Sequence, residues 1–207
     1  MTQQAPRRRI GMFGGAFDPP HNGHVALARA AVEQLRLDEL RIFPTGQAWH
    51  KARSLSDGAL RLAMSKLAFA PVPRVVVDTR EVLRAGPTYT VDTLRELHDE
   101  WPDAELLLII GADQAETLHT WNESGEIARL AILSIAARAR PVSDAPPADI
   151  SNLPAGFYEP INLPPIVVSS TEVRARVASG QTIEHLVPHA VARYIAEHHL
   201  YQLPLSP

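Results

Sequence analysis

The strongest constraint on the fold is an uninterrupted apolar run, Leu106-Leu107-Leu108-Ile109-Ile110, which ends at Gly111. A strand with one face in water alternates apolar and polar side chains, whereas this run contains no polar side chain. Both faces of the strand must therefore be covered by other elements. We expect this segment to lie at the centre of a parallel sheet that carries helices on both sides.

Strand patterns and helix patterns alternate along the chain, as a parallel sheet requires. Strands are predicted at residues 9–13, 40–43, 75–77, 106–110 and 132–135. Helices are predicted at residues 23–35, from about 57, at 89–100, 113–120, 123–130 and 171–179, and from 188. This alternation indicates an α/β fold with a doubly wound, mainly parallel, Rossmann-like sheet, in which ligands bind at the carboxyl ends of the strands.

Composition and charge limit the class of protein. The length of 207 residues predicts a single domain, 1–207, with a flexible tail at 1–8 and a proline-rich loop at 141–154. There are no cysteines, so disulfides and thiolate chemistry are excluded. No apolar run reaches the roughly 18 residues of a membrane span, and we expect a cytoplasmic protein without membrane contact. The net charge of -3 disfavours nucleic acid as a partner.

A glycine-rich and histidine-containing loop, residues 14–24, follows the first predicted strand. Gly14 and Gly15 let the backbone approach a ligand closely, and the start of the next helix favours phosphate oxygens. His21 and His24 are three residues apart, so both imidazoles can face one pocket and donate N–H bonds to a phosphoryl group. Two alternatives remain open: histidines that only structure the loop, and a metal pair, for which no clear third ligand is present.

A second phosphate-binding pattern is Ser169-Ser170-Thr171-Glu172-Val173-Arg174. It places three hydroxyls at a helix start and an arginine one turn later. Hydroxyls and free N–H groups bind phosphate oxygens, and Arg174 adds a permanent charge for the β- or γ-phosphate and a departing pyrophosphate. The alternative is an ordinary capped helix with a surface arginine.

The loop at 14–24 resembles the Gly-Gly-x-Phe-Asp-Pro-x-His-x-Gly-His signature of the nucleotidyltransferase superfamily, which includes nicotinate-nucleotide, phosphopantetheine and glycerol-phosphate nucleotidylyltransferases. The second pattern resembles the superfamily's Ile-Ser-Ser-Thr-x-x-Arg, with Val168 in place of isoleucine. The resemblance implies attack on the α-phosphorus of a nucleoside triphosphate, with His21, His24 and Arg174 as catalytic residues. It implies ATP binding by Gly14, Gly15, Ala16, Phe17, His24, Gly111, Asp113, Ser169, Ser170, Thr171 and Arg174.

Four segments between the signatures resemble the nicotinate-nucleotide branch. His50-Lys51 resembles its His-Lys loop, where a cation meets the mononucleotide phosphate, although Trp49 replaces the usual proline. Residues 88–94 resemble its Ser/Thr-Tyr-Thr-x-x-Thr-Leu, whose helix-start amides and Thr90 receive the nicotinate carboxylate. A helix N-terminus prefers a carboxylate to a carboxamide by charge.

The other two segments are Gly111-Ala112-Asp113, which resembles a Gly-x-Asp that binds ribose hydroxyls, and Thr120-Trp121, whose indole stacks on the pyridine ring. The chain departs from the family at 137–141, where Ala-Arg-Ala-Arg-Pro replaces Arg-Arg-Pro-Gly. The resemblance implies that the residues that bind nicotinate mononucleotide are Gly15, His50, Lys51, Tyr89, Thr90 and Trp121.

The implied reaction transfers the adenylyl group of ATP to nicotinate mononucleotide and yields nicotinate adenine dinucleotide and pyrophosphate, in NAD biosynthesis. The implied cofactor is Mg²⁺, held mainly by ATP phosphates and water, with no protein metal site. Phosphopantetheine as the acceptor and a non-catalytic nucleotide sensor are the alternatives, and a tRNA-binding role is weaker because the chain lacks a basic charge. The sequence leaves the oligomeric state open, a homo-oligomer included.

Overall fold

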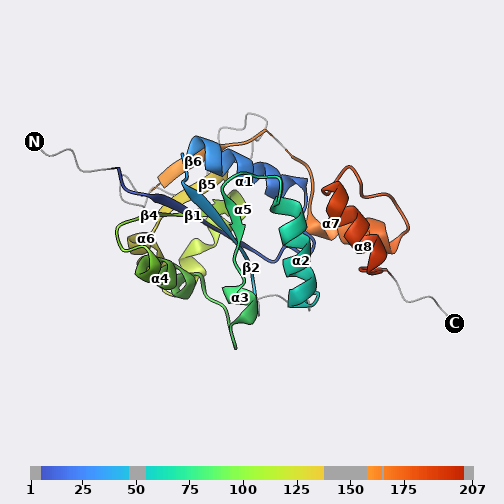
Figure 1. Cartoon of the computed structure of the whole chain (residues 1–207), viewed down its shortest axis with the longest axis horizontal. Coiled ribbons are helices and arrows are strands. Elements are labelled where there is room, and N and C mark those ends of the chain that lie inside the picture. The colour runs from blue at the N-terminus through green and yellow to red at the C-terminus, as the bar shows by residue number, and fades with distance from the viewer. Residues whose placement is uncertain (1–5, 47–54, 138–157, 165, 203–207) are drawn as a thin grey trace, which may run out of the picture.

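A computed structural model describes residues 6–46, 55–137, 158–164 and 166–202. Its centre is a six-stranded sheet with the order β3-β2-β1-β4-β5-β6 (Figure 1). Every neighbouring pair runs parallel. The strands are β1 (Arg9–Gly15), β2 (Glu39–Pro44), β3 (Val75–Val77), β4 (Glu105–Gly111), β5 (Ile132–Ala137) and β6 (Tyr158–Asn162). The predicted doubly wound parallel fold is confirmed.

Helices cover both faces of the sheet (Figure 1). They are α1 (Asn22–Gln34), α2 (Gly58–Phe69), α3 (Arg80–Leu83), α4 (Thr90–Glu100), α5 (Ala112–Glu116), the 3-10 helix η1 (Leu118–Thr120), α6 (Ser124–Leu130), α7 (Ser170–Ala178) and α8 (His189–Glu197). One face packs against α1, α2, α7 and α8, and the other packs against α4, η1 and α6. No helix among the described residues is long and apolar enough to cross a membrane.

Strand β4 lies next to β1 in the middle of the sheet, as its apolar run predicts. Leu107 and Ile109 point into the core on the α1 side, whereas Leu106, Leu108 and Ile110 point into the core on the α4 side. All five side chains are buried. Burial of one such side chain stabilises a fold by about 1.5–3 kcal/mol, so this strand anchors both layers of helices.

Four elements differ from the sequence-based prediction. Helix α3 was not predicted, because a helix of four residues is too short to show an apolar period. Strand β6 was not predicted, because in its sequence YEPIN only Ile161 is buried and Pro160 interrupts the pattern, which an edge strand tolerates. Strand β1 continues through Gly14 and Gly15, so both glycines belong to the strand rather than to the following loop. The helix predicted at 113–120 is divided into α5 and η1. The proline-rich segment 141–154 lies outside the described residues.

The strand order places a topological switch point between β1 and β4. The chain proceeds from β1 outward to β2 and β3, and then crosses to β4 and continues outward in the opposite direction. The connections that leave the carboxyl ends of β1 and β4 therefore diverge, and a crevice opens between them. Because ligands bind in such a crevice, this is where the functional site is expected.

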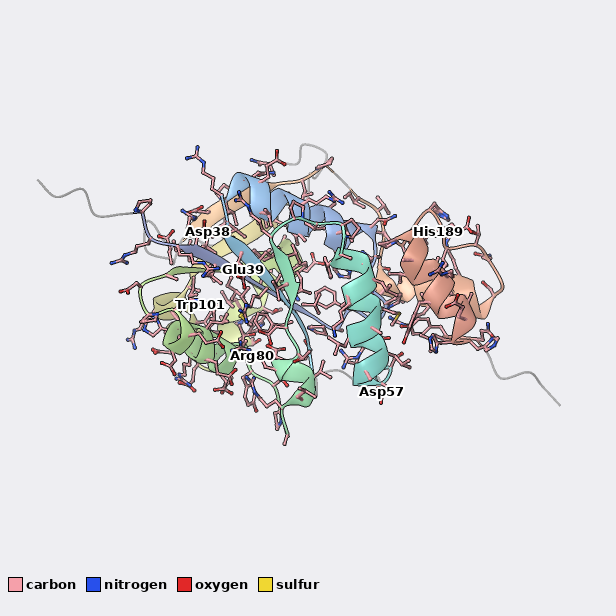
Figure 2. The ribbon with its side chains drawn as sticks, viewed as in Figure 1. Asp38, Glu39, Asp57, Arg80, Trp101 and His189 are labelled. Atoms are coloured by element: carbon pink, nitrogen blue, oxygen red, sulfur yellow. The ribbon has the colours of Figure 1, made fainter. Side chains whose placement is uncertain are left out.

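A charged cluster fixes α3 and α4 relative to β2. Arg41 on β2 and Arg80 on α3 share Asp78, at 2.8 and 2.9 Å, and both also pair with Glu100 at the end of α4. The guanidinium of Arg41 lies 4.4 Å from the ring centroid of Trp101, and Figure 2 shows Trp101 and Arg80 on the same side of the molecule. Burial opposes ionisation of Asp78, but the arginine bonds outweigh it and lower the pKa of this carboxyl.

Candidate active site

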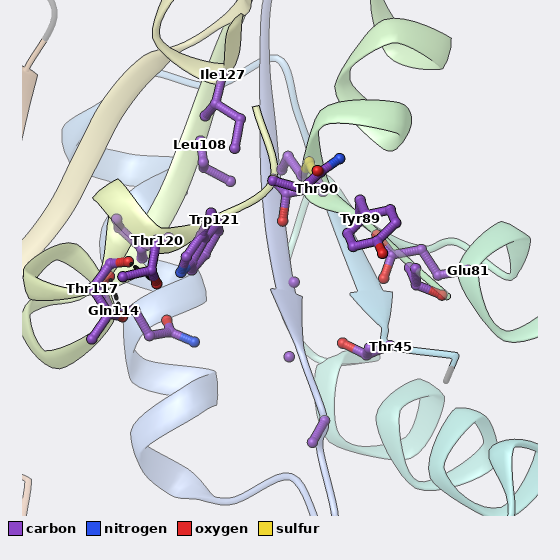
Figure 3. Close-up of a pocket in the computed structure, with 17 residues that line it drawn as sticks. Thr45, Glu81, Tyr89, Thr90, Leu108, Gln114, Thr117, Thr120, Trp121 and Ile127 are labelled. Carbon is purple, nitrogen blue, oxygen red and sulfur yellow. Dashed lines mark hydrogen bonds between the residues drawn. The ribbon is translucent and has the colours of Figure 1, made fainter. Parts of the chain in front are cut away.

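A cavity of about 400 Å³ opens at the carboxyl ends of β1 and β4, within the size range of small-molecule sites (Figure 3). Trp121, Thr120 and Gln114 lie on one side of it, and Tyr89, Thr90 and Glu81 lie on the other. It is lined by Met12, Gly14, Gly15, Ala16, Thr45, Glu81, Thr88, Tyr89, Thr90, Leu108, Ile110, Gln114, Thr117, Thr120, Trp121, Asn122 and Ile127. The expected switch-point crevice is therefore present.

Gly14 leaves space for a ligand rather than for the protein. A Cβ at Gly14 would meet no atom of the described residues within 4 Å, and the same holds at Gly111 at the end of β4. Neither residue has a positive φ, so the backbone does not require glycine at these positions. Gly15 differs, because a Cβ there would lie 3.0 Å from the ring of Phe17. The space in front of Gly14 supports the predicted close approach of a ligand to this backbone.

The two histidines of the first signature stack on each other at the start of α1. Their ring centroids are 3.6 Å apart and their planes differ by 19°. The main-chain N–H of His21 donates to Nδ1 of His24 at 3.1 Å. Because Nδ1 of His24 accepts a hydrogen bond, the neutral ring carries its proton on Nε2. His24 is therefore held in the tautomer that can donate from Nε2.

His21 is the more buried of the pair, with 9% of its surface exposed. Burial lowers the pKa of His21 to about 4, although a backbone hydrogen bond raises it slightly. Its Nδ1 atom is buried and has no hydrogen-bond partner in the described part of the chain. His21 is thus a neutral imidazole at pH 7, and a neutral ring still carries one N–H donor.

The second signature docks directly onto the first. The Ser170 hydroxyl donates to the carbonyl of Pro19 at 2.8 Å, and Nη1 of Arg174 donates to the carbonyl of Asp18 at 2.7 Å. Nη2 of Arg174 also donates to the Thr171 hydroxyl at 3.1 Å. The sequence predicts two phosphate-binding patterns, and the fold joins them although 151 positions separate Pro19 from Ser170.

The rest of the second signature also shapes the first. Ser169 caps α7, since its hydroxyl accepts the N–H of Glu172 at 3.1 Å. A Cβ at Gly23 would lie 3.2 Å from a methyl carbon of Val168 and 3.1 Å from Nδ1 of His21. The absence of a side chain at Gly23 therefore leaves space for the His21 ring, and Val168 borders the same space.

Arg61 supports the first loop and was not identified from the sequence. It is 2% exposed, and its guanidinium donates to the carbonyls of Ala16 (2.9 Å), Ser56 (2.9 Å) and Gly46 (3.3 Å). Burial lowers the pKa of Arg61, and the nearby Asp18 carboxyl opposes that shift. The signal in the sequence is an arginine three residues before Met64 on the inward face of an apolar helix.

Glu81 is a second residue that sequence reasoning missed. It lines the cavity, is 3% exposed and accepts a hydrogen bond from the Thr93 hydroxyl at 2.8 Å. Burial raises the pKa of Glu81 to about 7, against the opposing effect of the Thr93 bond. The neighbouring Thr88 hydroxyl has no hydrogen-bond partner among the described residues. The cavity therefore has a polar wall whose charge changes near neutral pH.

The remaining predicted residues divide into four groups. Tyr89, Thr90 and Trp121 line the cavity, as does Ala16. The Phe17 ring is 1% exposed and packs edge-on against Phe69 and His24, so an ATP contact at this position must come from its main chain.

Asp113 is exposed on α5 and is not part of the cavity wall. His50, Lys51 and Trp49 lie outside the described residues, as does the segment 138–141. In the described ranges, no group of three or more His, Cys, Asp or Glu side chains is placed to hold a metal ion.

Known proteins with the same fold share this architecture. A nicotinic acid mononucleotide adenylyltransferase from Plasmodium falciparum, complexed with APC, has a TM-score of 0.77 at 18% identity. The likeness covers 94% of this chain and 98% of that chain. The same protein complexed with NaAD gives a TM-score of 0.76. At this identity the likeness establishes the fold.

Sequence comparison establishes the family. Residues 12–176 match the family described as cytidylyltransferase-like. A protein of Albidiferax ferrireducens named probable nicotinate-nucleotide adenylyltransferase is 51% identical, over 94% of this chain and 98% of its own length. A protein of Methylibium petroleiphilum with the same name is 45% identical, over 97% of this chain and 95% of its own. The chain belongs to the nicotinate-nucleotide adenylyltransferase family.

Proposed function

We propose that this chain performs the reaction of its family through His21, His24 and Arg174, by moving the adenylyl group of ATP onto the phosphate of nicotinate mononucleotide. The products are nicotinate adenine dinucleotide, a precursor of NAD, and pyrophosphate. The observation that carries the proposal is the convergence of both signatures on one loop beside the cavity, where Arg174 binds the carbonyl of Asp18 at 2.7 Å. Transfer between two phosphates requires such a concentration of donors.

The chemical step exchanges one phosphorus–oxygen bond for another. An oxygen of the acceptor phosphate attacks the α-phosphorus of ATP, and the bond from that phosphorus to the β-bridging oxygen breaks with its electron pair. The acceptor phosphate is ionised at neutral pH, so no general base is needed. The protein's contribution is to hold two anions together and to stabilise charge on the α-phosphoryl group and pyrophosphate.

Each donor group has a place in this scheme. His24 donates from Nε2 to the α-phosphoryl oxygens, because its Nδ1 already accepts the N–H of His21. Arg174 and the start of α7 bind the β- and γ-phosphates that leave as pyrophosphate. ATP enters as its Mg²⁺ complex, with the ion held mainly by phosphate oxygens and water.

The acceptor occupies the cavity in this proposal. The Trp121 indole stacks on the pyridine ring, and Gly15 and Tyr89 line the space beside it. Helix α4 begins at Thr90, and the side chain of its N-cap residue, Tyr89, makes no capping hydrogen bond to the helix start. The N–H groups at the start of α4 favour the nicotinate carboxylate over the nicotinamide carboxamide. His50 and Lys51 are proposed to meet the acceptor phosphate.

The test is release of pyrophosphate with Mg-ATP and, in parallel, nicotinate mononucleotide, nicotinamide mononucleotide or phosphopantetheine. We expect the highest kcat/KM with nicotinate mononucleotide and a product with the mass of nicotinate adenine dinucleotide. Turnover with phosphopantetheine alone would overturn the acceptor and retain adenylyl transfer. ATP binding without pyrophosphate release from any acceptor would favour a nucleotide sensor.

A further inference from the structure

A tyrosine near the far end of the described chain contacts the first signature. The Tyr201 hydroxyl, after α8, donates to Oδ1 of Asp18 at 2.6 Å across 183 positions. Burial raises the pKa of Tyr201 above its usual range, and the bond to Asp18 raises it further. The hydroxyl therefore stays protonated and donates to Asp18 across the whole working pH range.

Asp18 is the point at which several segments meet. It is 1% exposed, and Oδ2 of its carboxyl accepts the main-chain N–H of Ser56 at 3.2 Å. Its own carbonyl accepts Nη1 of Arg174 at 2.7 Å. The two ends of this one residue thus connect the tyrosine to the arginine of the second signature. A shift of the Asp18 backbone that followed loss of the Tyr201 bond would also move the carbonyl that holds Arg174.

The backbone conformations of Tyr201 and Phe17 are a second observation that points to Asp18. Tyr201 has φ 62° and Phe17, which precedes Asp18, has φ 46°. Both are bulky residues in the left-handed region, which side chains larger than glycine rarely adopt. Such conformations persist only where the surroundings hold them, and they gather at functional sites. Two of them meet at Asp18, one on each side of the Tyr201–Asp18 hydrogen bond.

The Tyr201 ring also packs against the protein core, and this packing would be its whole contribution if Tyr201 had only a structural role. The Tyr201 ring packs against the core cluster that includes Phe69, and its hydroxyl lies 4.0 Å from the sulfur of Met64. Those ring contacts stay when only the hydroxyl is removed. The Ser56 side chain also makes a hydrogen bond to this hydroxyl. A phenylalanine at 201 therefore separates the hydrogen bonds of the hydroxyl, to Asp18 and to Ser56, from the packing.

We propose that Tyr201 is a positioning residue for the triphosphate, which holds Asp18 so that its carbonyl keeps Arg174 directed at the departing phosphates. The inference rests on the proposed function for the role of Arg174. In this proposal Tyr201 does not contact the substrate. Tyr201 affects ATP binding only through Asp18 and Arg174, and this dependence on Arg174 makes the proposal testable.

The experiment is a double-mutant cycle on the full chain with Y201F, R174A and the combined variant. The dissociation constant of Mg-ATP is measured without acceptor by titration calorimetry. We expect Y201F to weaken ATP about tenfold when Arg174 is present and less than twofold when it is replaced. D18N keeps the shape of the side chain and should show the same dependence on Arg174. In turnover assays, Y201F should raise KM for ATP and leave KM for nicotinate mononucleotide unchanged.

Y194F is the matched control, because Tyr194 lies on α8 and its ring packs on His198 with centroids 4.1 Å apart. It should leave ATP affinity unchanged. Equal effects of Y201F in both Arg174 backgrounds, or none in either, would overturn the proposal. If the wild-type protein binds ATP but does not use nicotinate mononucleotide, the proposed function is refuted. The double-mutant cycle would still measure the effect of Tyr201 on ATP affinity, because it contains no acceptor.

Discussion

Nδ1 of His24 accepts the main-chain N–H of His21 at 3.1 Å, and the same two residues stack their rings 3.6 Å apart. The pair is therefore ordered before any substrate arrives. His21 supplies the hydrogen bond that sets the tautomer of His24, and His24 covers one face of the His21 ring. Preorganised donors of this kind avoid the cost of reorientation during the reaction.

Replacement of His24 by alanine should lower kcat by roughly 100- to 1000-fold, the usual cost of one donor to a developing charge. KM for nicotinate mononucleotide should change little, because the acceptor cavity does not include His24. Steady-state kinetics with Mg-ATP measure both constants. His98→Ala is the control, since His98 is exposed near the end of α4, and it should retain wild-type kcat. A small effect of His24→Ala would remove His24 from the mechanism.

Gly14→Ala should separate the fold from ligand binding. Its Cβ meets no atom within 4 Å in the described part of the chain, and alanine loses less conformational entropy on folding than glycine. The free energy of unfolding should therefore rise or stay constant. ATP affinity, measured by titration, should fall at least tenfold because the methyl group occupies the space kept for the ligand. Unchanged affinity would place the nucleotide elsewhere.

Gly11→Ala, in the same strand, is the matched comparison for Gly14→Ala. Its Cβ would lie 2.6 Å from a methyl carbon of Leu37 and 2.8 Å from one of Leu40. Overpacking of this kind costs about 1–3 kcal/mol in the free energy of unfolding. Urea denaturation should therefore show a loss for Gly11→Ala and none for Gly14→Ala.

Trp121→Leu should raise KM for nicotinate mononucleotide roughly 10- to 100-fold, since stacking of a base on an aromatic side chain contributes about 1–3 kcal/mol. KM for ATP should change less than threefold. Trp101→Leu is the control, because Trp101 packs against Arg41 in the charged cluster. That variant should lose about 1 kcal/mol of stability and keep both KM values. Equal KM changes in the two variants would contradict stacking at Trp121.

Glu81 should make the stability of the protein depend on pH. Its pKa is raised to about 7 in the folded protein from an ordinary value of 4.5, so the folded state binds more protons between these values. This contribution to stability is fully present below pH 4.5 and is lost as the pH rises to about 7. The free energy of unfolding of the wild type, relative to Glu81→Gln, should fall by about 3 kcal/mol across that window.

Urea denaturation at four pH values between 4.5 and 7.5 measures the Glu81 effect. Glu116→Gln, exposed on α5, controls for the loss of one negative charge. A constant difference between the wild type and Glu81→Gln at all four values would show that this carboxyl is ionised in the folded state throughout.

The fold could be predicted from the sequence because strand and helix patterns are local. The apolar run of β4 and the cap of α2 at Asp57, whose carboxylate accepts the N–H of Ala59 at 2.7 Å, depend on neighbouring residues alone. Strand β6 could not be found in this way. Its place depends on pairing with β5 and on the salt bridge from Arg9 to Glu159, which joins residues 150 positions apart.

The residues of the candidate site also divide into those that a local sequence pattern predicts and those that depend on distant contacts. Cavity residues such as Tyr89, Thr90 and Trp121 lie in short recognisable segments, so their grouping could be predicted. Glu81 could not be predicted, and Arg61 was missed despite its inward position before Met64, because a charged residue on a helix normally faces water. Only the fold shows that both side chains are buried and hold or line the site.

The contact between Pro19 and Ser170 also has a consequence for synthesis of the protein. A ribosome makes the glycine-histidine signature long before the serine-arginine signature, and the N-terminal part of a chain begins to fold first. Until Ser170 and Arg174 emerge, the carbonyls of Pro19 and Asp18 lack the donors that hold them in the finished fold. A nascent chain with a complete first signature would therefore be chemically silent, and catalytic competence would appear late in translation.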